Sequence, residues 1–129
     1  MTDSAGTTTD YKISIDSNAH YIFVDVLRPM TSELGRRCAE DAVRLGERNG
    51  IKCFLVDLRD SPNIQSTLPN YQFAYHDMKE LGFPKDSRSA LLIDPDDRSH
   101  DFMETVFNNA GYNIRIFTDP ERALAWLSS

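Results

Sequence analysis

The sequence predicts a single α/β domain with one mixed, mostly parallel five-stranded sheet and helices, in the order ββαβαβαβα. Three observations lead to this fold class. Two β-type segments, 11–16 and 21–27, are joined by a short link and should form an antiparallel hairpin. The nearly continuous apolar run 51–58 is typical of a strand buried on both faces. Helical and extended patterns then alternate, which indicates parallel strands joined by right-handed crossovers.

The helix expected after the hairpin has the clearest signals. Thr31 or Ser32 can cap its start, and Asn49-Gly50 can end it, because these last two residues tolerate a left-handed conformation. A spacing of 3.6 residues per turn places four apolar residues on one face. That face consists of Leu34, Cys38, Ala42 and Leu45.

The rest of the chain repeats the helix and strand patterns after the run 51–58. Helices are expected near 69–82, 99–110 and 119–128, and strands over 89–94 and 113–117. We therefore expect one domain over 11–129.

Length and composition agree with one globular domain. The chain has 129 residues, of which 40% are hydrophobic and 26% are charged. Residues 1–10 are small and polar and are predicted to be a flexible N-terminal tail. They contain no apolar stretch typical of a signal peptide, so a cytoplasmic protein is expected.

The net charge and the residue types argue against several kinds of partner and of chemical site. A net charge of −6 should repel phosphate backbones, so no nucleic-acid partner is expected. Cys38 and Cys53 lie in apolar patterns and are predicted to be small buried residues rather than a disulfide or reactive thiols. The three histidines lack metal-ligand spacing, and the chain has no nucleophile elbow and no phosphate-binding glycine loop. We predict no enzyme, no cofactor and no metal.

Several segments resemble the SpoIIAA-like family of the STAS-domain superfamily. They are VDLRDSPNIQS after the third predicted strand, RSALLIDPDD around the fourth, and FTDPERALAWL at the C-terminus. The resemblance covers about residues 11–128 and implies the same fold and a regulatory role. In anti-anti-sigma members of this group, a serine after the third strand is phosphorylated within an Asp-Ser-Ser-Gly stretch. The resemblance places that phosphoacceptor at Ser66, where the aspartate and the glycine are missing; the alternative is a serine that caps helix 69–82.

Candidate ligand-binding residues lie at the predicted carboxyl ends of the parallel strands, where open α/β sheets bind ligands. Arg59, beside Asp60 and Ser61, could hold a carboxylate or phosphate; a salt bridge to Asp60 or Asp94 is the alternative. The aspartates at this edge could also hold a divalent cation. The alternative for them is helix capping, which is expected for Asp96, Asp97 and Asp119.

Helix 69–82 gives the strongest interaction signal. Its predicted core face contains Tyr71, Ala74, Tyr75, Met78 and Leu81. Phe73 then points to solvent together with His76, and Phe83 just beyond the helix can extend the same surface. Exposed aromatic residues are typical of partner contacts.

These observations support three functional hypotheses. The first is a non-catalytic regulatory or binding module, which uses loop 59–67 and helix 69–82 to contact a protein partner or to form a homodimer. The second is a carrier for a small apolar ligand or lipid, with a groove between helices and sheet lined by Phe102, Phe107 and Trp126, and with peripheral membrane contact. The third is a hydrolase or metal-dependent enzyme at the acidic strand-end edge.

Overall fold

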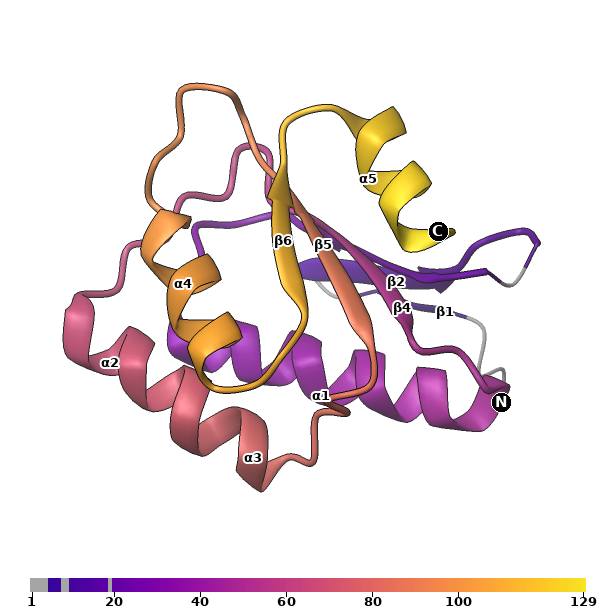
Figure 1. Cartoon of the computed structure of the whole chain (residues 1–129), viewed down its shortest axis with the longest axis horizontal. Coiled ribbons are helices and arrows are strands. Elements are labelled where there is room, and N and C mark those ends of the chain that lie inside the picture. Colours follow the sequence, from indigo (N-terminus) through magenta and orange to yellow (C-terminus); the bar gives the residue numbers. More distant parts are fainter. Residues whose placement is uncertain (1–4, 8–9, 19) are drawn as a thin grey trace.

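The computed structural model describes residues 5–7, 10–18 and 20–129. Within them the chain forms one mixed sheet whose six strands lie side by side in chain order (Figure 1). The strands are β1 (Ala5–Thr7), β2 (Tyr11–Ile15), β3 (Ile22–Val26), β4 (Cys53–Asp57), β5 (Arg88–Leu92) and β6 (Ile114–Phe117). The first three are antiparallel neighbours, and β3 to β6 are parallel. The predicted fold class is confirmed, with β2 to β6 as the five expected strands.

Strand β1 is an addition to the predicted sheet. It lies in the segment expected to be a tail and pairs with β2, with Gly6 opposite Ile13. Two of its three residues, Ala5 and Gly6, are disfavoured in strands, so backbone pairing at the sheet edge accounts for the strand better than the sequence does. The residues 1–4 and 8–9 of the predicted tail lie outside the described residues.

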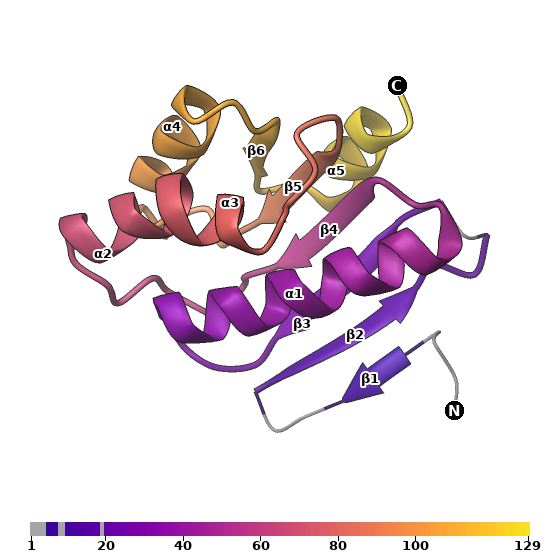
Figure 2. The ribbon, with the colours of Figure 1, turned by 90° about the horizontal axis from the view of Figure 1, so that it is seen from below.

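The connections from β3 to β6 place their helices on one face of the sheet. These helices are α1 (Ser32–Asn49), then α2 (Thr67–Gln72), the π-helical turn η1 (Phe73–Asp77) and α3 (Met78–Glu80), and finally α4 (Asp101–Asn109). Each connection leads to the next strand in the same direction, so crossovers of one hand keep the helices on the same side. Figure 2 shows α1 beside the segment α2–η1–α3, with α4 next to it. The larger apolar core fills the space between these helices and the sheet.

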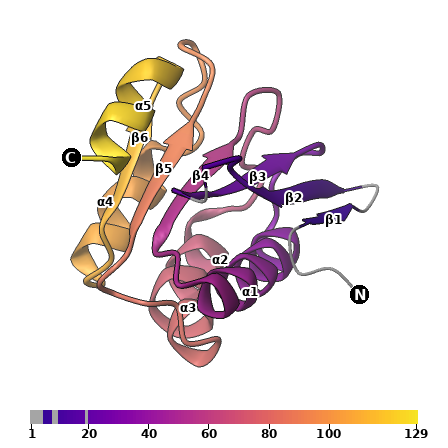
Figure 3. The same ribbon diagram turned by 90° about the vertical axis from the view of Figure 1, so that its right-hand side faces the viewer.

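The opposite face of the sheet is covered by the last helix, α5 (Pro120–Leu127) (Figure 3). Ala123 and Leu127 of α5 pack there on Leu55, Ala90 and Leu92. The helix begins as predicted, because the Asp119 carboxylate accepts a hydrogen bond from the Glu121 N–H and Pro120 occupies the first turn.

Helix α1 follows its predicted pattern closely. The Thr31 hydroxyl accepts a hydrogen bond from the Leu34 N–H (3.1 Å), and Gly50 ends the helix in the left-handed conformation (φ 67°). The four residues predicted to face the core are buried. A Cβ on Gly46 would lie 2.6 Å from the Ile51 carbonyl oxygen, so glycine permits the tight turn into β4.

The helical segment after β4 differs from the prediction. It begins at Thr67, two residues early, and η1 interrupts it, with the Met78 N–H bonded to the Phe73 carbonyl five residues back. In a regular α-helix, positions five residues apart are offset by about 140°. The wider π turn instead lets Phe73 and Met78 both face the core.

The predicted orientation of Phe73 is therefore wrong. Its side chain is buried, 9% exposed, and packs edge-on against Phe107 with the ring centroids 6.0 Å apart. Tyr71 and Tyr75, which were predicted to be in the core, point to solvent instead. Phe83 does not extend an exposed aromatic surface, which was the prediction for it. Its half-buried ring packs between the rings of Phe54 and Tyr112.

Candidate functional site

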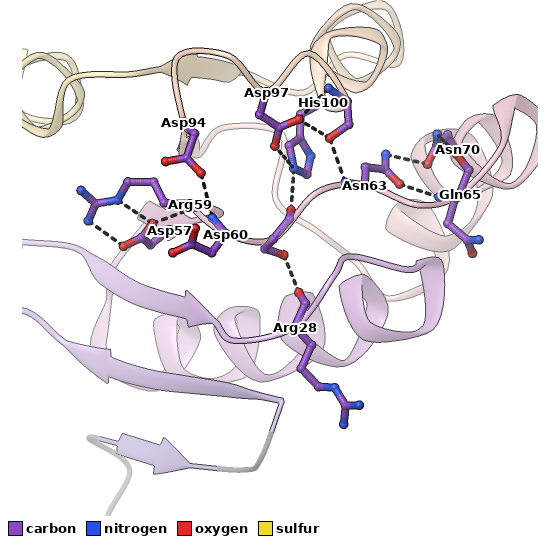
Figure 4. A network of polar contacts seen from close by, with 12 residues as sticks. Arg28, Asp57, Arg59, Asp60, Asn63, Gln65, Asn70, Asp94, Asp97 and His100 are labelled. Carbon is purple, nitrogen blue, oxygen red and sulfur yellow. Dashed lines mark hydrogen bonds and ion pairs between the residues drawn. The ribbon is translucent and has the colours of Figure 1, made fainter.

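The loop after β4 is held at the carboxyl ends of the parallel strands by buried polar contacts (Figure 4). The fully buried Ser61 hydroxyl donates a hydrogen bond to the Arg28 carbonyl (2.6 Å). The Ser61 carbonyl accepts one from Nε2 of His100, a residue that is itself buried (2.9 Å). Ser61 therefore joins this loop to both the end of β3 and the start of α4, and its role is structural.

Asp97 completes the support around His100. Its carboxylate oxygen Oδ2 lies 3.7 Å from Nε2 of His100. Burial alone would raise the pKa of Asp97. The hydrogen bonds donated by the Ser99 hydroxyl and N–H outweigh that effect and hold this pKa below its usual value.

A second set of contacts holds the loop up to α2. The Asn63 side chain donates to Oδ1 of Asn70 (3.1 Å) and accepts from the Gln65 N–H (3.0 Å). Oε1 of Gln65 in turn accepts from the Ser32 N–H (3.1 Å) at the start of α1. Together with the contact between Ser61 and His100, these hydrogen bonds connect the segment 61–65 to α2 and to the starts of α1 and α4.

Arg59 has a fixed partner, which is neither of the two that the sequence indicated. Its guanidinium binds the Asp57 carboxylate with both branches, Nε to Oδ1 at 3.0 Å and Nη2 to Oδ2 at 2.8 Å. Its own N–H donates to the same carboxylate. The neighbouring Asp60, at φ 65°, instead donates its N–H to Asp94. The ion pair occupies Nε and Nη2, whereas no hydrogen bond is made by Nη1 among the described residues, and the side chain is 46% exposed.

The aspartates at this edge line an open hollow of about 460 Å³. Asp25 lies opposite Asp57 in the sheet, and burial, followed by the charge of Asp57, raises its pKa. In the ranges that the structure describes, no group of three or more His, Cys, Asp or Glu residues is arranged to hold a metal ion. Asp57 and Asp94 accept hydrogen bonds from within the fold, and the third hypothesis stays a prediction.

The outer side of the segment α2–η1–α3 carries an exposed apolar stripe. Leu68, Tyr71 and Tyr75 form it at spacings of three and four residues, and we call these three residues the tyrosine stripe. They are 64%, 49% and 39% exposed, respectively, and the two tyrosine rings stack with centroids 4.6 Å apart. Ile64, just before α2, is also exposed.

The remaining predicted site residues lie near this stripe. Ser66 is exposed at the N-cap position of α2, but its side chain makes no capping hydrogen bond. His76 is exposed, and its Nε2 lies 3.5 Å from Oε2 of Glu80. The structure thus brings Ser66 and His76 to the helix surface predicted for contacts, while it places Phe73 and Phe83 inside.

The aromatic residues predicted to line a carrier groove do not share one space. Phe107 is buried between α4 and the sheet, whereas Phe102 is exposed. Trp126 lies on the opposite face, where it packs against Phe117. Within the described part of the chain, no helix is both long and apolar enough to cross a bilayer.

Comparison of the chain with protein-family models, with curated proteins and with solved structures finds no match. The resemblance to the SpoIIAA-like family therefore stays a prediction from the sequence segments and the order of elements.

Proposed function

We propose that this chain is a non-catalytic regulatory or binding module, which contacts a protein partner through the loop 59–67 and the outer face of α2 and η1. The tyrosine stripe carries the proposal. Tyrosine is enriched in protein interfaces, because it combines a large rigid apolar ring with a hydroxyl. These side chains gain little from folding of the monomer, since the opposite side of the same helix supplies Phe73, Ala74 and Met78 to the core.

The rigid loop before the stripe adds support. Ser61, Asn63 and Gln65 are each held by hydrogen bonds to other elements. A surface that is fixed before binding loses less conformational entropy when a partner docks.

Ser66 supplies a means of regulation within the same proposal. Its exposed hydroxyl lies two residues before Leu68, the first residue of the tyrosine stripe. Phosphorylation would add a charge of about −2 beside this apolar surface. The position assigned from the SpoIIAA-like family agrees with this use of Ser66.

A cytoplasmic location is part of the proposal. Cys38 and Cys53 are both free, and such cysteines are typical of reducing compartments.

The test is site-specific photo-crosslinking in cells, with a photoreactive residue at position 75 or, as a control, at position 125. Ala125 is also exposed but lies on α5, which covers the opposite face of the sheet. We expect one recurrent protein crosslinked from position 75 and not from position 125, and loss of that crosslink on Tyr71→Ser. If position 75 gives no more specific product than position 125, the tyrosine stripe is not the interface. Sedimentation equilibrium of the purified protein then shows whether the crosslinked partner is a second copy of the chain.

A further inference from the structure

We infer that the space between the sheet and the helices α1, η1 and α4 is a binding site for a small neutral molecule that is mostly apolar and carries one hydrogen-bonding group. The cavity measures about 120 Å³. An engineered apolar cavity of about 150 Å³ holds one benzene ring. The occupant is therefore about the size of a single ring or a six-carbon chain.

The lining determines the charge of the occupant. The walls are mainly apolar side chains from the sheet and the helices, among them Phe54, Leu91, Phe73, Met78 and Met103. Among the described residues that form these walls there is no Asp, Glu, Lys or Arg, and Nε2 of His100, which also lines the cavity, already donates to the Ser61 carbonyl. Burying an unpaired charge here would be strongly unfavourable, which excludes a carboxylate or an ammonium group.

A buried hydroxyl determines the polar group of the occupant. Ser89 lines the cavity, is only 3% exposed, and its Oγ has no hydrogen-bond partner among the described residues. Buried hydroxyls are nearly always hydrogen-bonded, so Ser89 Oγ points to a ligand atom that donates to it or accepts from it.

The surroundings of Ser89 favour an organic molecule over water. Ser89 lies near the amino end of β5, paired in the sheet with Phe54 and Ile114. A buried water needs two to four polar partners. The other orphan hydroxyl, of Ser32, begins α1 and so lies toward the opposite end of the cavity, near the carboxyl ends of the strands.

The π turn shapes this site. Because η1 turns both Phe73 and Met78 inward, it supplies two of the cavity walls. A π turn inside a helix frequently marks a functional site, and here it separates the cavity on its inner side from the tyrosine stripe on its outer side. The two sites can therefore be tested independently.

The test is calorimetric titration of the purified protein with n-hexanol and benzyl alcohol, with n-hexanoate as the charged probe of matched length. We expect saturable binding of at least one neutral probe and none of n-hexanoate. Ser89→Ala should weaken that binding about three- to tenfold, because one hydrogen bond to a neutral group is lost. Ala42→Leu, which fills the cavity from α1, should abolish it.

Several results would overturn the inference. They are the absence of saturable binding of both neutral probes, equal binding of n-hexanoate, and wild-type affinity in either Ser89→Ala or Ala42→Leu. If Ala42→Leu does not fold, Ser89→Ala and the comparison of neutral with charged probes still test the inference. Tyr71→Ser should leave probe binding unchanged, so failure of this inference is distinct from failure of the proposed interface.

Discussion

The helix α1 and the segment α2–η1–α3 cover the same face of the sheet but are stabilised in different ways (Figure 2). α1 is capped at its start by the Thr31 side chain and closed at its end by Gly50. The segment α2–η1–α3 lacks such a cap at its start, because the Ser66 side chain makes no capping hydrogen bond. Its end is closed like that of α1, with Gly82 in the left-handed conformation (φ 77°) and the Phe83 N–H bonded to the Met78 carbonyl. The two segments therefore differ at their starts and in the π turn, which interrupts only the second.

The π turn bears on function, because such turns inside helices frequently mark functional sites. The segment that contains η1 carries the tyrosine stripe outside and lines the cavity inside. Both proposals therefore concern the helical segment that departs from the regular repeat of α1.

The largest expected effect is on the inner side of η1. Phe73→Ala removes the edge contact with Phe107 and the packing against Gly35, where the Phe73 ring lies 3.3 Å from an ideal Cβ position. We expect a loss of about 3–5 kcal/mol in the free energy of unfolding. Tyr75→Ala, on the outer side, should cost less than about 1 kcal/mol. Urea denaturation of both variants measures the two losses, and a larger loss in Tyr75→Ala would contradict the orientation of this segment.

A smaller effect compares the two N-termini directly. Thr31→Ala removes the hydrogen bond to the Leu34 N–H and should cost about 1 kcal/mol. Ser66→Ala removes a side chain that makes no such bond, so we expect a change within about 0.5 kcal/mol. The urea denaturation midpoints of the two variants, each compared with that of the wild type, measure these two changes in stability. Equal losses would mean that the two helix starts do not differ as described.

The same contrast explains how far the sequence predicts the fold. Leu34, Cys38, Ala42 and Leu45 follow a regular 3.6-residue repeat, and the prediction for α1 is confirmed. The prediction for Phe73 fails because it assumes that same repeat through a π turn. Long-range contacts of Phe73 with α1 and α4 accompany this turn, and no signal near residue 73 reveals them.

The candidate site is predictable in place but not in detail. The sequence predicts that Arg59, Asp60 and Ser61 lie at the carboxyl ends of the strands, because parallel strands end at one edge of the sheet. It does not identify Asp57 as the partner of Arg59, or the burial of His100. Both depend on which polar groups meet after the loops close, and a polar residue gives no local sign that it will be buried with a partner.

The smallest expected effect concerns the ion pairs that join the two helical segments. The Arg36 guanidinium of α1 donates to Oε1 of Glu80 in α3 (2.6 Å) and lies 3.6 Å from Asp77 in η1. The hydrogen bond from Arg36, and then its charge, hold the pKa of Glu80 below the ordinary value of 4.5. A lowered folded-state pKa stabilises the protein above the unfolded-state value, and that contribution is lost as the pH falls through the folded-state pKa.

Glu80→Gln should therefore slightly lower the stability at neutral pH and reduce the further loss between neutral pH and the acid range below the ordinary value of 4.5. The pair is exposed and screened by salt, so the effect should shrink at high ionic strength. Thermal denaturation across this pH range measures it, with Glu47→Gln on the exposed side of α1 as the control for loss of one surface charge. If Glu80→Gln changes the pH dependence no more than Glu47→Gln does, Arg36 does not tie α1 to α3 in solution, and the second segment is held by the packing of Phe73 and Met78 without that ion pair.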